Sequence, residues 1–261
     1  MPSITYCKSD QPADKYRLRG EYFSRLQEAQ ELFLEILIRK GHLYEIKVND
    51  SLAGYAIVSS KNQLLEFHLS PAAVNAADML FGLLIKKLSL KSGYVKSFDA
   101  LSVACAANHH QKLSVEGYLY RHRPIHKDFS LPKGIKTRLP VSKDNASIFA
   151  LNEEIFLDDD EIDEYIQKKY MHLFFRKKEL LGLVIHSPVI ENRPEYDVGM
   201  LVAPPFRKQG FGKAFLSFGI NYVTEQGGRP QMGCAANNIA SQRTIEALGF
   251  ISRYRMFEFT F

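Results

Sequence analysis

The stretch Met200-Leu-Val-Ala-Pro-Pro-Phe-Arg-Lys-Gln-Gly-Phe-Gly-Lys-Ala214 decides which fold this chain is expected to adopt. An apolar strand ends at Pro204, a short basic turn follows, and a helix begins at about Phe211. A strand–turn–helix of this kind presents unpaired backbone N–H groups and the positive end of a helix to an anion. The two glycines of the turn let a phosphate approach the backbone, and its basic side chains add charge. The stretch therefore predicts a phosphate-binding loop.

Two common phosphate loops do not fit this stretch. A Walker A loop requires Gly-x4-Gly-Lys followed by Ser or Thr, but Arg207 stands at the first glycine position and Ala214 at the hydroxyl position. A dinucleotide fingerprint requires Gly-x-Gly-x-x-Gly, and Phe215 occupies the place of the third glycine. The loop therefore belongs to another class.

A second block lies one strand further along the chain, at Asn238-Ile-Ala-Ser-Gln-Arg-Thr-Ile-Glu-Ala-Leu-Gly-Phe250. Asn238 is a favourable N-cap residue, and Ser241 lies about one turn into the expected helix. Gly249 is a natural residue to follow the last helical turn. The block therefore predicts a capped helix that ends at a Gly-Phe pair.

Together the two blocks resemble the GNAT acetyltransferase superfamily, whose pattern is matched by Val202-x-Pro-x-x-Arg-x-x-Gly-x-Gly212. The resemblance implies that the loop amides bind the pyrophosphate of coenzyme A, with acetyl-CoA as cosubstrate and no metal. It also implies that the second block contacts the pantetheine or phosphate part of the cofactor. The predicted cofactor-binding residues are Leu201, Val202, Arg207, Lys208, Gln209, Gly210, Phe211, Gly212, Lys213, Asn238 and Ser241.

The chain also contains an internal repeat. The tetrapeptide Cys-Ala-Ala-Asn occurs at 105–108 and again at 234–237. Each copy follows a strand that runs into a proline and then a helix-like apolar stretch. Each copy precedes a polar helix-like stretch closed by Gly and an aromatic residue, and a strand-like tail, 118–129 or 250–261. The order strand, helix, strand, helix, strand is therefore expected twice.

Two prolines and a glycine between Leu131 and Pro140 indicate the boundary between the halves. By resemblance, the expected α/β (α+β) fold is two tandem GNAT-like modules, each a mixed, mostly antiparallel sheet flanked by helices. Residues 136–261 would be the acetyltransferase domain that binds acetyl-CoA. Residues 1–130 would be a degenerate copy without bound cofactor, because the corresponding loop, Leu69 to Asp78, has no arginine and no glycine.

The resemblance implies direct transfer of the acetyl group to a neutral amine, assisted by a base. Asp197 and Glu195 lie on one face of the strand before the loop, and Asp197 is predicted to be the catalytic base. The alternative is that both are exposed carboxylates at the entrance of the strand. Related enzymes often carry a tyrosine acid in the last helix, where this chain has Ile245. Cys234 could be a nucleophile, but a small core residue is the commoner role for such a cysteine.

Composition excludes several other classes of protein. The net charge of +5 suits an anionic ligand but forms no basic stripe, so no nucleic-acid partner is expected. The three cysteines form no CxxC pair, so no zinc site is expected. The start of the chain has no apolar segment typical of a signal peptide, and the longest apolar run, Met79 to Ile85, is too short to span a bilayer. We expect a cytoplasmic protein without a membrane partner.

The sequence therefore predicts an N-acetyltransferase that transfers the acetyl group of acetyl-CoA to a primary amine. A small-molecule amine is the expected acceptor, because the degenerate half could wall off a pocket, and a protein N-terminus or lysine is the alternative. The rival function is a non-catalytic acyl-CoA-binding or regulatory module. It is suggested by the missing tyrosine and by the uncertain base.

Overall fold

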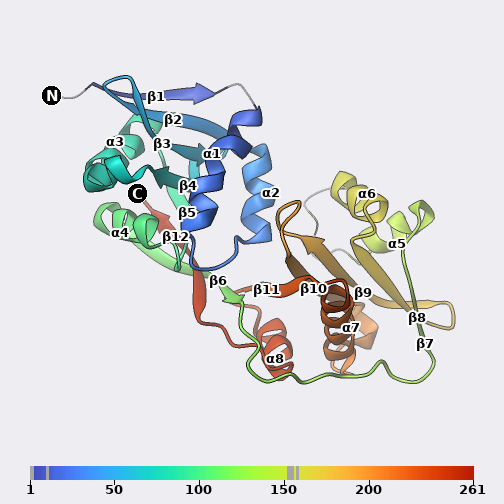
Figure 1. Ribbon diagram of the computed structural model, residues 1–261. Helices are drawn as coiled ribbons and strands as arrows, with labels where there is room; N and C mark the ends of the chain where they lie inside the picture. The colour runs from blue at the N-terminus through green and yellow to red at the C-terminus, as the bar shows by residue number, and fades with distance from the viewer. Residues whose placement is uncertain (1–2, 10–11, 152–155, 157–158) are drawn as a thin grey trace. The chain divides into compact units, whose positions relative to one another are not determined.

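The computed structural model of the 261-residue chain describes residues 3–9, 12–151, 156 and 159–261 (Figure 1). The chain divides into two compact units. Unit 1 comprises Met1–Leu119 together with Arg253–Phe261, and unit 2 comprises Tyr120–Ser252. Among the described residues, no helix is long and apolar enough to cross a membrane.

Unit 1 is a twisted sheet covered by helices on both faces. Its strands are β1 (Ile4–Ser9), β2 (His42–Val48), β3 (Ser51–Val58), β4 (Gln63–Leu69), β5 (Ser92–Lys96), β6 (Lys112–Tyr120) and β12 (Tyr254–Thr260). Their order is β1-β2-β3-β4-β5-β12-β6, and only β4 and β5 run parallel. The helical segments are α1 (Pro12–Arg25), α2 (Leu32–Lys40), η1 (Pro71–Ala76), α3 (Ala77–Leu88) and α4 (Ala100–His109).

Two apolar clusters hold unit 1 together, one on each face of the sheet. On one face, Phe81 of α3 and Ala106 of α4 pack against strand residues such as Phe67. On the other face, Tyr22 of α1 and Leu34 of α2 are buried with residues of β2, β3 and β4. The burial of both faces accounts for the nearly continuous apolar sequence of β3 and β4.

The last strand of the chain, β12, lies inside the sheet of unit 1. It pairs antiparallel with β5 on one side and with β6 on the other. The alternating sequence of its residues predicted a half-buried strand. The strand is confirmed, but both of its faces are packed, because Met256 is buried in the cluster with Tyr22 and Phe259 in the cluster with Phe81. The family-domain limits 1–130 and 136–261 thus remain a proposal, since the compact units group residues 253–261 with the first half.

Unit 2 is a five-stranded sheet with the order β11-β10-β9-β8-β7. The strands are β7 (Ile135–Arg138), β8 (Met171–Arg176), β9 (Glu179–Pro188), β10 (Glu195–Val202) and β11 (Arg229–Ala235), and only β10 and β11 run parallel. The helical segments are η2 (Ser142–Asp144), α5 (Asn145–Phe149), α6 (Asp159–Gln167), η3 (Pro204–Phe206), α7 (Phe211–Glu225) and α8 (Ile239–Ala247). The predicted fold class, mostly antiparallel mixed sheets flanked by helices, is confirmed.

The expected order strand, helix, strand, helix, strand occurs in both halves, as β4-α3-β5-α4-β6 and β10-α7-β11-α8-β12. The Cys-Ala-Ala-Asn copies, however, do not occupy equivalent places. Residues 105–108 lie within α4, whereas 234–237 lie at the end of β11 and in the turn before α8. The first copy is shifted because the Asp99 side chain accepts a hydrogen bond from the N–H of Ser102 and so starts α4 before the tetrapeptide.

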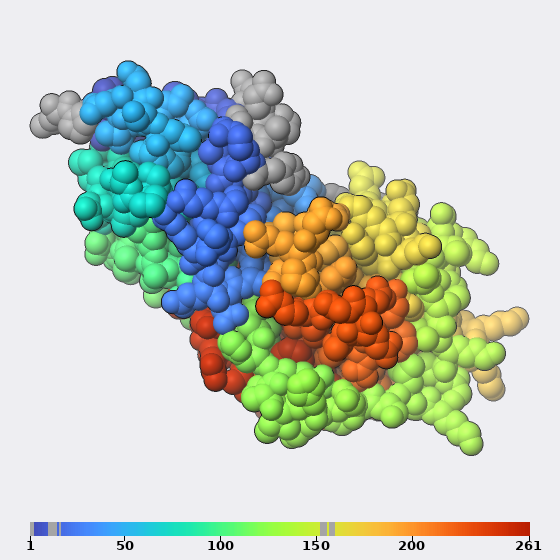
Figure 2. Space-filling model, viewed as in Figure 1, coloured from blue at the N-terminus to red at the C-terminus, as the bar shows by residue number. Residues whose placement is uncertain are grey.

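The expected strand at 118–129 is wrong for most of its length. Strand β6 ends at Tyr120, and residues 121–134, light green, run beside α8 and α7 (Figure 1, Figure 2). Pro124 has no N–H to donate to a strand partner. Arg123 Nε instead donates to the carbonyl of Leu248 over 3.0 Å, and the N–H of Phe129 donates to Ser217 Oγ over 2.8 Å.

A row of rings joins α7 to the sheet of unit 2. Phe174 of β8 stacks on Phe215 of α7 with ring centroids 3.9 Å apart. Two residues before Phe174 on β8, His172 Nδ1 lies 2.9 Å from His186 Nε2 of β9, and both rings contact Tyr222. Burial lowers the pKa of both imidazoles, that of His186 to about 4. The pair is therefore neutral at pH 7.

Acidification should destabilise unit 2 through this pair. The pKa of His186 in the folded protein lies below the ordinary value of 6.5, so the unfolded state binds a proton at a higher pH than the folded state does. Protonation therefore stabilises the unfolded state relative to the folded one as the pH falls below about 6.5. Between pH 7 and pH 5 the free energy of unfolding should fall by about 2 kcal/mol from His186 alone. Urea titrations followed by circular dichroism measure this change.

His186→Gln should lose most of that pH dependence, whereas His126→Gln, at an exposed position in the same unit, should keep it. If the free energy of unfolding of His186→Gln depends on pH as steeply as that of the wild type, the histidine pair does not cause this dependence.

Candidate functional site

The candidate site of unit 2 begins where two parallel strands part. The pairing of β10 with β11 covers Glu195↔Arg229, Tyr196↔Pro230 and Asp197↔Gln231 and then stops. Both strands continue, β10 to Val202 and β11 to Ala235. The backbone of β10 beyond Asp197 is therefore paired with β9 on one side but not with β11 on the other. Such a gap exposes backbone groups of a central strand to a ligand.

The loop after β10 has the form that its sequence predicts. Gly210 is the N-cap residue of α7, with φ of 86°, and no side chain caps the helix. A Cβ added at Gly210 would meet no heavy atom within 4 Å, so the space above the loop is open. The loop residues from Pro204 to Gly210 are at least partly exposed. Some of their backbone N–H groups donate hydrogen bonds within the turn. The first amides of α7 thus have no side-chain cap and lie next to a glycine with open space around it, as an anion site requires.

Residues of β10 and α8 pack against the first turn of α7. A Cβ placed at Gly212 would lie 3.1 Å from Met200 Cε of β10 and 3.5 Å from Thr244 Cγ2 of α8. The N-cap of α8 is confirmed, because Asn238 Oδ1 accepts the N–H of Ser241 over 3.0 Å. The two sequence blocks that carry the resemblance therefore lie side by side in the fold.

The predicted cofactor-binding residues differ in how far they are exposed to solvent. The side chains of Leu201, Val202 and Phe211 are buried, so only their backbone is available to a ligand. Arg207 is exposed, and its Nε donates to the carbonyl of Val202 over 3.0 Å. Lys208, Gln209 and Asn238 are exposed, and Gly212, Lys213 and Ser241 are partly exposed.

On the opposite face of β10 from α7, Asp197, Gly199 and Leu201 form one row. Leu201 packs in a cluster with Ile148 of α5 and Ile162 of α6. A Cβ added at Gly199 would meet no heavy atom within 4 Å, so the row contains an open space next to Asp197. Glu195, at the start of the strand, is already ion-paired with Arg229.

Cys234 of β11 is half-buried, and burial raises the pKa of its thiol to about 11, with Glu246 adding to the effect. It is therefore a neutral thiol at pH 7. Within the described part of the chain, no three His, Cys, Asp or Glu side chains come together as metal ligands would.

Residues 13–123 match the family model of an acetyltransferase (GNAT) domain, and residues 143–250 match that of the acetyltransferase (GNAT) family. The chain belongs to the GNAT acetyltransferases. Its two matches make it a tandem GNAT protein, and acetyl transfer is the activity of that family. Among curated proteins, none matches the chain.

Solved structures share this fold over the whole chain. A GNAT-family acetyltransferase from Colwellia psychrerythraea aligns with a TM-score of 0.88 at 21% identity and covers 99% of each chain. A tandem GNAT protein from the clavulanic acid biosynthesis pathway has a TM-score of 0.65 at 12% identity, covering 99% of this chain and 98% of that one. A GCN5-related N-acetyltransferase from Sphaerobacter thermophilus has a TM-score of 0.66 at 15% identity, covering 98% and 95%.

The first GNAT domain has the same parting of strands but a different loop. The parallel pairing of β4 with β5 covers only Gln63↔Ser92 and Leu64↔Gly93. The helix α3 that follows has neither a glycine nor a basic residue in its first turn. Asp78 lies there instead, and its carboxylate accepts a hydrogen bond from Asn108 and pairs with His109. A carboxylate at this position repels a phosphate.

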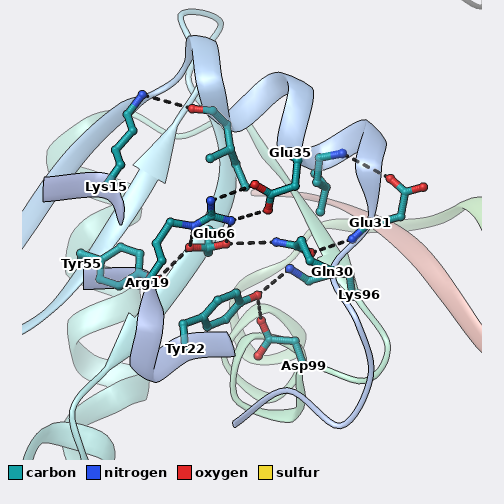
Figure 3. A network of polar contacts seen from close by, with 12 residues as sticks. Lys15, Arg19, Tyr22, Gln30, Glu31, Glu35, Tyr55, Glu66, Lys96 and Asp99 are labelled. Atoms are coloured by element: carbon teal, nitrogen blue, oxygen red, sulfur yellow. Dashed lines mark hydrogen bonds and ion pairs between the residues drawn. The ribbon is translucent and has the colours of Figure 1, made fainter. Parts of the chain in front are cut away.

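In the first domain, buried polar and charged side chains gather around Glu66 of β4 (Figure 3). Arg19 of α1 donates from Nε to Glu66 Oε1 of β4 over 2.7 Å and from Nη1 to Glu35 Oε2 of α2 over 2.9 Å. Tyr55 Oη donates to Glu66 Oε1 over 2.7 Å, and Gln30 Nε2 donates to Glu66 Oε2 over 3.1 Å. All five side chains are buried.

A second chain of contacts continues from β5. Lys96, which is 1% exposed, donates from Nζ to Tyr22 Oη over 2.5 Å, and Tyr22 Oη donates to Asp99 Oδ2 over 2.8 Å (Figure 3). Burial lowers the pKa of Lys96, and Asp99 and Glu66 oppose that shift. The two strands that part therefore contribute Glu66 and Lys96 to one buried polar network, held by two side chains of α1.

Removing one member of this network should unfold the first domain more easily. Arg19→Met leaves Glu35 and Glu66 buried without their cation, so the free energy of unfolding should fall by about 3–5 kcal/mol. Arg17→Met is the matched control on the same helix, because the Arg17 side chain is 60% exposed and lies 4.0 Å from Glu45. It should change stability by less than about 1 kcal/mol. Equal urea midpoints for the two variants would contradict the structural role of the network.

Proposed function

We propose that this chain is an N-acetyltransferase whose second GNAT domain binds acetyl-CoA and transfers the acetyl group directly to a primary amine. One observation carries the proposal: a strand that parts from its neighbour leads through an exposed glycine loop into the uncapped N-terminus of α7. The parted strand suits a thin chain such as pantetheine, and the helix end suits the pyrophosphate that follows it. The acceptor is proposed to be a small-molecule amine, with a protein N-terminus or lysine as the alternative.

In this proposal the eleven cofactor residues act in three ways. Backbone amides of Gln209 to Lys213 hold the pyrophosphate, since Gly210 leaves the space above them open. The side chains of Arg207, Lys208 and Lys213 add positive charge. The backbone of Leu201 and Val202 contacts the pantetheine, and Asn238 and Ser241 contact it from the start of α8.

Asp197 is proposed to be the base that removes a proton from the amine. Its place on β10 supports this role, because the open space at Gly199 adjoins it on the same face. The rival carboxylate, Glu195, is already ion-paired with Arg229. The N–H groups of β10 that β11 does not pair can stabilise the oxyanion of the tetrahedral intermediate.

Direct transfer is favoured over a covalent intermediate on Cys234. A thiol with a pKa of about 11 is protonated at neutral pH and is a poor nucleophile. A buried aliphatic side chain, Ile245, stands at the position of the usual tyrosine acid, so the thiolate of coenzyme A leaves without that residue's help. The same observation favours the second candidate, a regulatory module that binds acyl-CoA without turning it over.

We propose that the first GNAT domain binds no acetyl-CoA. The two strands that part there carry Glu66 and Lys96, which Arg19 and Tyr22 bind in a buried polar network, and Asp78 lies in the first turn of the helix that follows. A thioester could enter only by displacing several buried ion pairs and hydrogen bonds.

Acetyl-CoA should raise the melting temperature of the protein, since a ligand that binds only the native state stabilises it by about 2.7 kcal/mol at one hundred times its Kd. Gly210→Val should abolish the shift, because a side chain there occupies the space above the amides. Calorimetry of the wild type should give one site per chain.

Gly227→Val is the matched control for this experiment. Gly227 also has a positive φ, 78°, and open space around its Cβ position, but it follows the other end of α7. Both variants should lose about 1–2 kcal/mol from backbone strain, and only Gly210→Val should lose the response to acetyl-CoA. A full response in Gly210→Val would refute the loop assignment, and two sites per chain would refute the proposal for the first domain.

Asp197→Asn should lower turnover by about 10²–10⁴-fold while leaving the Kd for acetyl-CoA nearly unchanged, because the amide keeps the shape of the side chain but takes up no proton. A thiol-release assay over a panel of amines measures the rate. Glu195→Gln, which removes the carboxylate paired with Arg229, should retain most of the activity. A wild type that binds acetyl-CoA but acetylates no amine would favour the regulatory module, and an active Asp197→Asn would exclude Asp197 as the base.

A further inference from the structure

Arg176 is the last residue of β8 and lies on the face of that strand that packs against α7. Nothing in the sequence connects it with the loop before α7. His172, Phe174 and Arg176 alternate along this strand and face α7. His172 contacts Tyr222, and Phe174 stacks on Phe215. The Arg176 guanidinium carbon lies 5.2 Å from the ring centroid of Phe211, the first residue of α7.

The position of Arg176 follows from the register of the sheet. Val202, the last residue of β10, is opposite Gly182 of β9, and Gly182 is in turn opposite Phe174 of β8. The hairpin from Arg176 to Glu179 therefore lies at the same end of the sheet as the loop that follows β10. An arginine on this hairpin can reach the start of α7 although it lies far from the loop in sequence.

Arg176 is also unneutralised. Within the described part of the chain, no carboxylate lies within 4.0 Å of Arg176, Lys208 or Lys213. Arginines elsewhere are ion-paired, as Arg19, Arg25, Arg123, Arg138 and Arg229 are with carboxylates. Arg176 thus lies beside the first residue of α7 without a counter-charge, and Lys208 precedes the N-cap Gly210 by two residues, whereas Lys213 Nζ lies 5.2 Å from the ring centroid of Phe129. Like charges near one helix end repel one another unless an anion lies between them.

We propose that Arg176 is a further cofactor-binding residue and that its guanidinium binds the pyrophosphate of acyl-CoA from the side of β8. This inference rests on the proposed function of the loop. The face of Phe211 holds the flat guanidinium, and stacking leaves the N–H groups at its edge free to donate to phosphate oxygens. A lysine in the same position would supply charge without that paired geometry.

Isothermal calorimetry with coenzyme A and with dephospho-coenzyme A tests the proposal, because both ligands carry the pyrophosphate and only the first carries the 3′-phosphate. Arg176→Met should weaken both by the same factor, about tenfold or more, as expected for lost hydrogen bonds to a charged group. Arg176→Lys should recover part of the loss. Lys178→Met, which removes one exposed charge from the same hairpin, should weaken binding less than about threefold.

Each outcome has a separate meaning. Equal Kd values for Arg176→Met and the wild type would overturn the inference, while the loss of binding in Gly210→Val would still support the loop. A loss confined to coenzyme A would overturn the pyrophosphate assignment in favour of the 3′-phosphate. A loss in Lys178→Met as large as that in Arg176→Met would reduce the effect to long-range charge. A wild type that binds neither ligand would refute the proposed function and this inference with it.

Discussion

The parting of two parallel strands is the constraint on which both domains depend. In the second domain β10 and β11 separate after Asp197↔Gln231, and in the first β4 and β5 separate after Leu64↔Gly93. Parting leaves backbone groups without ladder partners and opens a space inside the sheet. Buried backbone groups need partners and protein interiors are closely packed, so such a space must be filled by side chains, water or a ligand. The two domains differ in how they meet this requirement.

In the first domain the two parted strands carry buried charges that other side chains of the domain neutralise. Arg19, Glu35 and Glu66 form buried ion pairs, and Lys96 is held by Tyr22. A cluster of this kind stabilises the fold only while every member is present, because any one left alone is a desolvated charge. It therefore cannot give way to a ligand as an apolar side chain would. In the second domain the corresponding strand carries Gly199, with open space beside it, and leads to a loop of glycines and basic residues.

The parts of this arrangement that are local in sequence could be predicted. The spacing from Val202 to Gly212 specifies a strand end, a turn with positive φ at Gly210 and a helix start, all within eleven residues. Asn238 likewise caps a helix three residues ahead of Ser241. The Cys-Ala-Ala-Asn repeat wrongly suggested that the two copies occupy equivalent places. Four identical residues do not show which residue caps α4. Contacts over long separations had no local pattern: Arg19 with Glu66, β12 between β5 and β6, and Arg176 beside Phe211.

The net charge of +5 does not show what distinguishes the loop. Attraction of an anion there depends on whether nearby carboxylates neutralise the local cations. Glu195 and Arg229 cancel at the start of the strand, whereas the residues that follow its far end, with Arg176 from β8, form a positive region beside the amides of α7. An anionic cofactor is thus attracted to one end of the strand only. In the proposed binding mode, a pyrophosphate at that end would direct the rest of the molecule back along the parted strand towards Asp197, the proposed base.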